Sequence, residues 1–275
     1  MGFSWDFQTF ILGLVQGLCE FLPVSSSGHL SLLQHFFGFT ESDNLIAFDL
    51  LLHCATVLVI LIFFRKKVIR ILYEWFSGWI SKENRSSWGW KYGWQILIAV
   101  FMTGLSGLPL KKIVEAMSDS PRAVGFGLIF TAVVLSFLPV LSNKRKKKFS
   151  LFSIAVGVGI AQGLAVLPGV SRSGMTIATG ILMGLSLIEA FQFSFLISVP
   201  AVLGASLLEF LKIMKIPDSI FLPNGYVWAL IIAFLSGALA LRLTKKLVLS
   251  GKWAYFGLYC LFVGAMAVLL SLEIF

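Results

Sequence analysis

The chain has 275 residues, of which 58% are hydrophobic and only 13% are charged, and its mean hydropathy is +0.92. A soluble domain of this size has too little interior to hide so much apolar surface, so these values exclude a soluble helical enzyme. The net charge of +9 does not indicate a nucleic-acid partner, because the basic residues lie between apolar segments and form no stripe with aromatic residues. Long, uninterrupted apolar segments predict an all-α polytopic membrane protein rather than a barrel.

The first apolar arm, residues 7–22, is too short to cross a bilayer. As a helix it would be ~24 Å long, against a hydrocarbon core of ~30 Å. Pro23 and the serines after it end this arm, and the returning arm, residues 29–39, is shorter still. We therefore predict a re-entrant hairpin over about residues 7–39. Its irregular tip must be buried in protein or face a water-filled cavity.

The remaining segments divide the chain into two similar halves. Segments long enough to span a membrane are predicted at residues 46–64, 92–110, 123–141, 188–211, 226–241 and 253–272. A second short pair of arms predicts a re-entrant hairpin over about residues 150–185, with its tip at Pro168 to Gly174. The predicted organisation is a first repeat over 1–143, a basic linker over 144–149 and a second repeat over 150–275.

The two hairpin tips share a motif. Residues 16–28 and 162–174 are identical at seven of thirteen positions at a constant offset of 146 residues, and both contain Ser-x-Ser-Gly. We interpret this as an internal duplication. Because each half has three spans, an odd number, the second repeat should be inverted relative to the first. The two tips should then meet near the membrane midplane, where we expect the function to reside.

The basic residues predict the orientation. With the 65–91 loop in the cytoplasm, sixteen Lys and Arg residues fall on the cytoplasmic side and five on the other. This asymmetry places the 144–149 linker inside and both termini outside.

Three ionisable residues, Glu20, His29 and Arg172, lie in otherwise apolar hairpins. Charged groups are costly at membrane depth, so these residues are candidates for function. The alternative is a structural ion pair that locks the two hairpins together.

The two tips have the composition of an anion site. Hydroxyls and backbone N–H groups at helix starts bind phosphate, and an arginine adds a planar fork suited to phosphate oxygens. This pattern favours phosphate over carboxylate or halide. The predicted phosphate-binding residues are Ser25, Ser27, Ser171, Arg172, Ser173, Gly174 and Thr176.

Gln16 and Glu20 are one helical turn apart and could hold a hard divalent cation, although an amide is a weaker ligand than a carboxylate. The alternative is a hydrogen-bonded pair on the helix surface. The sequence leaves open whether Ser26, His29 or water attacks the substrate. Asp49 and His53, one turn apart in the next span, are either partners of the catalytic groups or a polar stripe between helices, and we favour the stripe.

The loops resemble the signature motifs of the bacterial undecaprenyl-diphosphate phosphatase family of the bacitracin-resistance type. The resemblance rests on Gln16 to Glu20, on Pro-Val-Ser-Ser-Ser-Gly-His at Pro23 to His29 and on Pro-Gly-Val-Ser-Arg-Ser-Gly-Met-Thr at Pro168 to Thr176, and it extends to Phe193 to Pro200. Many members of the family have Glu where this chain has Gln16. By position, the family's functional residues fall on Glu20, Ser26, His29, Ser171, Arg172, Ser173 and Thr176.

The resemblance implies an integral enzyme of the bacterial inner membrane that hydrolyses undecaprenyl diphosphate to the monophosphate and inorganic phosphate, which recycles the lipid carrier of cell-wall synthesis and confers resistance to bacitracin. It also implies a divalent cation, Mg or Ca, and a site that opens to the extracytoplasmic side. The expected catalytic residues are Glu20, Ser26, His29 and Arg172. The expected partners are the polyprenyl diphosphate and membrane lipids, and the oligomeric state, including a homo-oligomer, is left open. The alternative function is a transporter that moves a prenyl phosphate between leaflets, because inverted repeats with broken helices are also a transporter architecture.

Overall fold

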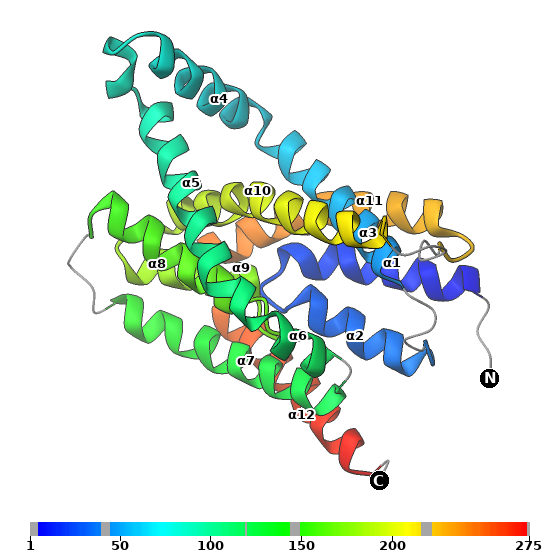
Figure 1. The fold of residues 1–275 in the computed structure, drawn as a ribbon. Coiled ribbons are helices and arrows are strands. Elements are labelled where there is room, and N and C mark those ends of the chain that lie inside the picture. The colour runs from blue at the N-terminus through cyan, green and yellow to red at the C-terminus, as the bar shows by residue number, and fades with distance from the viewer. Residues whose placement is uncertain (1–4, 40–44, 119, 144–148, 216–221, 274–275) are drawn as a thin grey trace.

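The computed structural model describes residues 5–39, 45–118, 120–143, 149–215 and 222–273, and all regular elements in these ranges are helical (Figure 1). Six helical segments are long and apolar enough to cross a membrane, as predicted. The α-helices are α1 (Trp5–Phe21), α2 (Ser26–Phe36), α3 (Ile46–Phe63), α4 (Arg65–Ile80), α5 (Trp88–Gly107), α6 (Lys111–Ser118), α7 (Pro121–Asn143), α8 (Leu151–Leu164), α9 (Arg172–Leu182), α10 (Leu187–Ile213), α11 (Tyr226–Leu249) and α12 (Trp253–Glu273).

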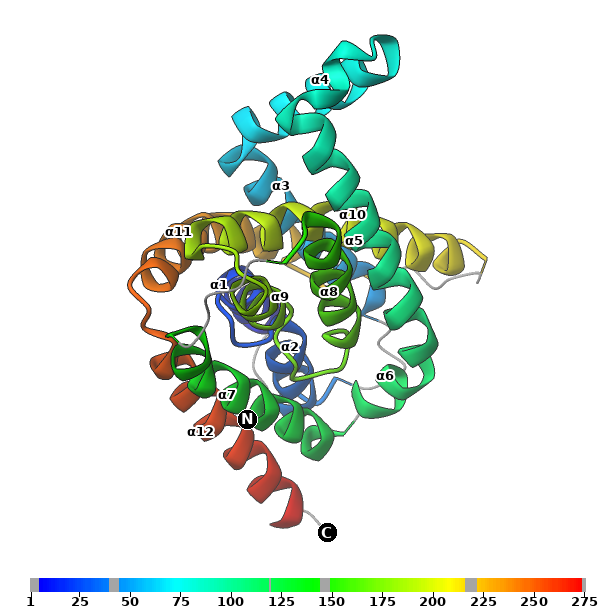
Figure 2. The same ribbon diagram turned by 90° about the vertical axis from the view of Figure 1, so that its left-hand side faces the viewer.

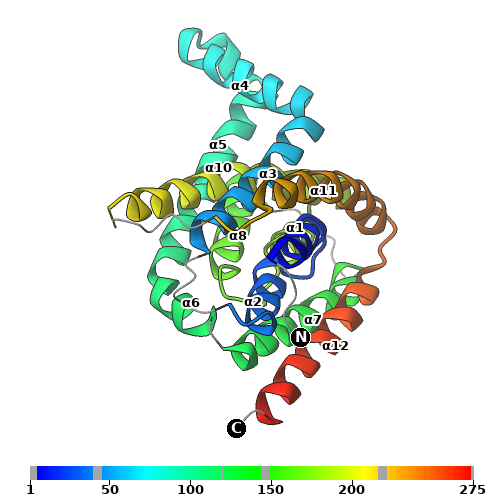
Figure 3. The same cartoon turned by 90° about the vertical axis from the view of Figure 1, so that its right-hand side faces the viewer.

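The four short helices lie at the centre of the molecule. Viewed from either end, α1, α2, α8 and α9 are surrounded by the long helices α5, α7, α10, α11 and α12 (Figures 2 and 3). In Figure 1, the α1–α2 hairpin and the α8–α9 hairpin approach each other from opposite ends of the bundle. Because the long helices enclose them, the irregular hairpin tips are shielded from lipid, as non-helical backbone at membrane depth requires.

Glycines allow the central helices to pack closely on the outer ones. A Cβ at Gly17 of α1 would collide with the Ser236 hydroxyl of α11, and a Cβ at Gly163 of α8 would collide in the same way with Ser106 of α5. These two glycines occupy equivalent positions of the sequence repeat. Small residues at such interfaces let helix backbones approach each other within a membrane.

Two helices lie where the sequence suggested loops. The 65–91 segment contains α4, which forms a hairpin with the first part of α5 that extends away from the bundle (Figure 1). The 111–122 segment contains the short helix α6. Both segments carry charges that suggested loops, but α4 places apolar residues such as Val68, Ile71 and Trp75 on one face at helical spacing.

The duplicated motifs adopt similar local structures, since each tip ends in a serine that caps the returning helix. The Ser25 Oγ accepts a hydrogen bond from the Gly28 amide at 3.3 Å, and Ser171 Oγ accepts one from Gly174 at 3.1 Å. The inverted relation of the two whole repeats stays a prediction. Residues 144–148 of the predicted basic linker lie outside the described residues.

Candidate active site

The two hairpin tips are in direct contact. Ser173 at the start of α9 donates a hydrogen bond to the carbonyl of Leu22 at the end of the first arm, at 3.2 Å. The backbones of the tips also pack tightly, because a Cβ at Gly28 would lie only 2.9 Å from the Gly169 Cα. The sequence prediction that the tips meet is therefore confirmed for the described residues.

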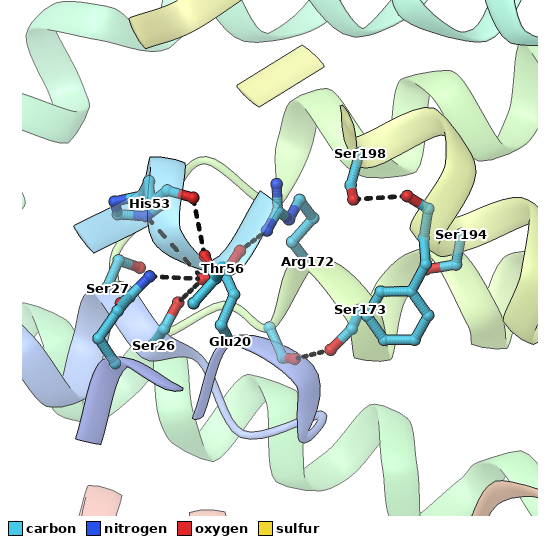
Figure 4. A network of polar contacts seen from close by, with 12 residues as sticks. Glu20, Ser26, Ser27, His53, Thr56, Arg172, Ser173, Ser194 and Ser198 are labelled. Atoms are coloured by element: carbon cyan, nitrogen blue, oxygen red, sulfur yellow. Dashed lines mark hydrogen bonds and ion pairs between the residues drawn. The ribbon is translucent and has the colours of Figure 1, made fainter. Parts of the chain in front are cut away.

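Glu20 is the centre of the polar contacts between the tips (Figure 4). Its Oε1 pairs with the Arg172 guanidinium, and its Oε2 accepts a hydrogen bond of 2.6 Å from the Ser26 hydroxyl and one of 3.2 Å from the Gln16 amide. The His53 Nε2 lies 3.9 Å from the same Oε2. The Glu20 side chain is only 3% exposed, against 24% for Arg172 and 28% for His53, so the carboxylate is held by its partners while these two side chains retain access to space around it.

A cavity of about 330 Å³ adjoins this cluster. Glu20, Ser25, Ser26, Ser27, His53 and Arg172 line its polar part. Glu209 of α10 also lines it and pairs with Lys111 at 3.0 Å and with Lys212 at 2.6 Å. The cavity is thus large enough for a small anionic group and contains one fixed carboxylate, one guanidinium and several hydroxyls at the tips.

The second tip contributes less surface to the cavity than the sequence suggested. Arg172 lines the cavity, but Ser171, Ser173 and Thr176 are 1%, 5% and 1% exposed and are not among its lining residues. Thr176 contacts the Ser194 hydroxyl at 2.5 Å, and the Ser171 amide donates to Thr131 at 2.9 Å. These side chains, and Gly174 through its capping amide, fix the position of the tip from which Arg172 projects.

The first tip is strained and held in place by a histidine. Ser25 has a φ of 69°, the one positive φ of a described residue other than glycine, and such a conformation costs of order 1–3 kcal/mol. The Ser25 carbonyl accepts a hydrogen bond of 2.8 Å from the His29 Nδ1. The Nε2 of His29 lies 2.9 Å from the Tyr259 hydroxyl, and the two rings are stacked. His29 therefore links the strained tip to α12.

Comparison with known proteins finds relatives over almost the whole length of this chain. The sequence profile of the family described as "Bacitracin resistance protein BacA" matches residues 9–266. The chain belongs to the BacA family. Proteins named "Undecaprenyl-diphosphatase" from Bacteroides fragilis and Bacteroides thetaiotaomicron are 39% and 38% identical to it, over 96% and 98% of this chain and 98% and 100% of their own lengths. One of the same name from Protochlamydia amoebophila is 34% identical over 95% of this chain and 97% of its own length.

In this BacA-family protein, the imidazole that lines the cavity is His53 rather than His29. Both ring nitrogens of His29 have partners at the tip and α12, and His29 is not a lining residue. The Nδ1 of His53 lies 2.8 Å from the carbonyl of Asp49, which directs Nε2 toward Glu20. Asp49 itself accepts hydrogen bonds of 3.1 and 3.3 Å from Gln34 and so joins α3 to α2. Asp49 thus connects two helices, as expected for a polar stripe, and the catalytic role of His53 beside Glu20 stays a prediction.

Four further polar residues at the site were not singled out from the sequence: Thr103, Thr131, Ser194 and Tyr259. Each is a hydroxyl-bearing residue inside a long apolar helix, and each contacts a motif residue in the structure. Their signal is the isolated polar side chain in a spanning segment, which at membrane depth needs a partner.

The residues around Glu20 fit a divalent cation only with help from a substrate. The side-chain amide of Gln16 donates a hydrogen bond to Glu20 through its nitrogen, and its oxygen, Oε1, is buried without a hydrogen-bond partner. The described residues contain no group of three or more His, Cys, Asp and Glu side chains that could hold a metal. Magnesium commonly takes one or two protein ligands and completes its shell with water and phosphate oxygens, so Glu20, which lines the cavity, suits such a cation. Gln16 is fully buried and does not line the cavity, so it is the weaker candidate.

Proposed function

We propose that this chain is an integral membrane phosphatase that hydrolyses undecaprenyl diphosphate to undecaprenyl phosphate and inorganic phosphate. The observation that carries the proposal is the arrangement on Glu20: a hydroxyl on one carboxylate oxygen and a guanidinium on the other, beside a cavity. The names of the BacA-family relatives support the same substrate. Recycling of the lipid carrier and resistance to bacitracin follow from that activity.

Glu20 is placed to accept a proton from the attacking group. The Ser26 hydroxyl donates to its Oε2 at 2.6 Å, so the carboxylate can take the proton of Ser26 or of a water bound in the same cavity. The attacking oxygen forms a bond to the terminal phosphorus, the bond from that phosphorus to the bridging oxygen breaks, and the prenyl phosphate leaves. If Ser26 attacks, water then hydrolyses the phosphoserine.

Arg172 serves as the electrostatic partner of the transferred phosphoryl group. In the structure its guanidinium contacts Glu20 through Nη2. A guanidinium has five N–H donors, so a bound phosphate can engage the others, and the pairing with Glu20 keeps the fork in position. Phosphoryl transfer depends mainly on such positioning and charge stabilisation at the equatorial oxygens.

A divalent cation, Mg or Ca, would be held by Glu20, by Gln16 Oε1 and by the diphosphate. When bound, it would neutralise part of the charge on the phosphate oxygens. The protein's own contribution is to fix Glu20 through Ser26, Gln16 and Arg172, so that one carboxylate orientation is available.

We place the protein in the bacterial inner membrane with its cavity open to the extracytoplasmic side. Glu209 lines one part of the cavity and pairs with Lys111 and Lys212. The basic-residue asymmetry puts the segments of these two lysines outside. Substrate produced on that side of the membrane would then reach the site directly.

The test is release of inorganic phosphate from undecaprenyl diphosphate by the purified protein in detergent, with Ser26→Ala as the matched variant. We expect release by the wild-type protein and a loss of at least ~10²-fold in Ser26→Ala, as for removal of a nucleophile or of the group that positions water. A wild-type protein that binds the lipid but releases no phosphate would instead favour the lipid transporter.

A further inference from the structure

A second polar cavity lies away from the tips, where α4 leaves α3. Its volume is about 280 Å³, and it is lined by residues of α4, α5, α8 and α10, among them Lys67, Lys91, Gln95, Glu189 and Gln192. It shares no lining residue with the cavity at Glu20. The charged residues of this end of the bundle, which include Arg65, Lys66 and Arg70, belong to the predicted cytoplasmic side.

Lys67 is the central cation of this cavity. Its ammonium donates to the amide oxygen of Gln192 and lies over the rings of Trp88 and Tyr92, 5.2 and 5.6 Å from their centroids. Burial lowers the pKa of Lys67, whereas the charge of Glu189 raises it. The ammonium is therefore partly desolvated, and a bound anion would restore the stabilisation of its charge.

An unsatisfied hydroxyl lies on one of the residues that line the cavity. Tyr92 lines the cavity, and its OH is buried with no hydrogen-bond partner. A buried hydroxyl without a partner costs free energy, so such a group usually marks a place where a bound molecule or ion completes the hydrogen bonding. One unpaired donor beside two lysines suits an oxyanion.

An apolar groove adjoins the polar cavity. It has a volume of about 330 Å³ and is lined almost wholly by carbon. Its lining residues lie one helical turn after those of the cavity, on the same helix faces: Ile71 after Lys67 in α4, Ile96 after Tyr92 in α5 and Leu196 after Gln192 in α10. A cationic cavity followed along the same helix faces by an apolar groove has the two parts that a phosphate headgroup and a hydrocarbon chain require.

We propose that this cavity and groove bind one anionic phospholipid, with its phosphate at Lys67, Lys91 and the Tyr92 hydroxyl and one chain along α4 and α5. Basic cavities between spanning helices on the cytoplasmic side bind anionic headgroups by charge attraction. A choline lipid fits less well, because the Lys67 ammonium already occupies the faces of Trp88 and Tyr92 that would otherwise receive a quaternary ammonium. Glu189 opposes the anion, and its Oε2 is engaged by the amide and hydroxyl of Ser186.

The test is native mass spectrometry of the full chain in detergent with phosphatidylglycerol of long acyl chains. Lys67→Gln and Lys91→Gln remove one charge each from the cavity, and Lys91 is exposed, so that variant should fold normally. The matched control is Lys246→Gln, which removes an exposed charge from the same predicted side of the membrane at a distant position in α11. Phosphatidylcholine, dihexanoyl phosphatidylglycerol and inorganic phosphate complete the set of probes.

We expect the wild-type protein to retain one long-chain phosphatidylglycerol in preference to phosphatidylcholine. Each lysine variant should lose roughly fivefold in apparent affinity, as for one basic residue at an anionic membrane surface, and the control should lose none. Lys91→Gln should release phosphate from a prenyl diphosphate at the wild-type rate. Equal retention of phosphatidylcholine, an equal loss in the control or an unchanged affinity in Lys91→Gln would overturn the proposal. Competition by dihexanoyl phosphatidylglycerol as strong as that of the long-chain lipid would show that the long chains contribute nothing. Equally strong competition by inorganic phosphate would show that the ligand is a free phosphate. Either result would overturn the lipid assignment.

Discussion

Glu20 and Arg172, 152 residues apart in the chain, form an ion pair that joins the tips of the two central hairpins. The pair combines two interpretations that the sequence offered as alternatives. It links the hairpins, and it also places a guanidinium at the edge of the cavity beside Ser26. Substitutions at Arg172 can separate these two contributions, because a lysine retains the charge but lacks the planar fork.

We predict that Arg172→Lys lowers kcat/KM by ~10²-fold or more, the scale of losing one oriented donor to a transition state. The variant should insert, purify and melt close to the wild-type Tm, because an ammonium can still pair with Glu20. Arg172→Ala should lose activity and also lower the Tm, since it leaves a buried carboxylate without its cation. The measurements are phosphate-release kinetics and a thermal melt in detergent. A fully active Arg172→Lys protein would show that the residue only locks the hairpins.

The two histidines should differ in what they affect. His53→Ala removes the imidazole that lines the cavity, so kcat should fall by at least ~10-fold with little change in Tm. His29→Ala removes the contacts that hold Ser25 and Tyr259. The free energy of unfolding should therefore fall by ~1–3 kcal/mol, the cost of a buried partner left unpaired, and the Tm should fall with it. Kinetics and melts on both variants provide the comparison. Unchanged kinetics in His53→Ala, together with a normal melt and lost activity in His29→Ala, would restore the catalytic role to His29.

This contrast also shows what the sequence could and could not predict. Short arms, Pro23 and the duplicated Ser-x-Ser-Gly were enough to predict two hairpins whose tips meet, because helix length and backbone satisfaction in a membrane permit few alternatives. The sequence favoured His29 as the catalytic imidazole, whereas the structure places His53 at the wall of the cavity. His29 lies in the first turn of α2 and His53 lies inside α3, and only the rotation of α2 and α3 about their axes decides which ring faces the cavity. The helix α4 was missed because its first turn carries the charges Arg65, Lys66 and Lys67, which are typical of a loop.

Activity should require a divalent cation. Gln16 and Glu20 supply two protein oxygens at most, so the cation should bind weakly in the absence of substrate and be removed readily by a chelator. We expect phosphate release to stop in excess EDTA and to return on addition of Mg or Ca. Gln16→Glu, which adds a carboxylate, should lower the cation concentration that gives half-maximal activity, and the exposed Glu115→Gln should not change it. Full activity in excess chelator would remove the metal from the mechanism.

The orientation can be tested with single cysteines in a background without Cys19, Cys54 and Cys260. Lys246→Cys, at the predicted cytoplasmic end of α11, should resist a membrane-impermeant thiol reagent in intact cells, whereas Lys215→Cys, after α10, should react. Permeabilised cells provide the control for accessibility of both positions. The opposite pattern in intact cells would invert the topology and place the cavity mouth in the cytoplasm.

The central claim is that residues of both hairpins form one catalytic site, and a double-mutant cycle of Glu20→Gln and Arg172→Lys tests it most directly. Each variant and the double variant would be assayed for kcat/KM with undecaprenyl diphosphate, with thermal melts to confirm that all four proteins are folded. Residues that act as a unit show strongly non-additive losses. We predict that each single substitution lowers kcat/KM by ~10²-fold or more. The kcat/KM of the double variant should then be little lower than that of the less active single variant. Losses that multiply in the double variant, or a near-normal rate in either single variant, would contradict a shared site.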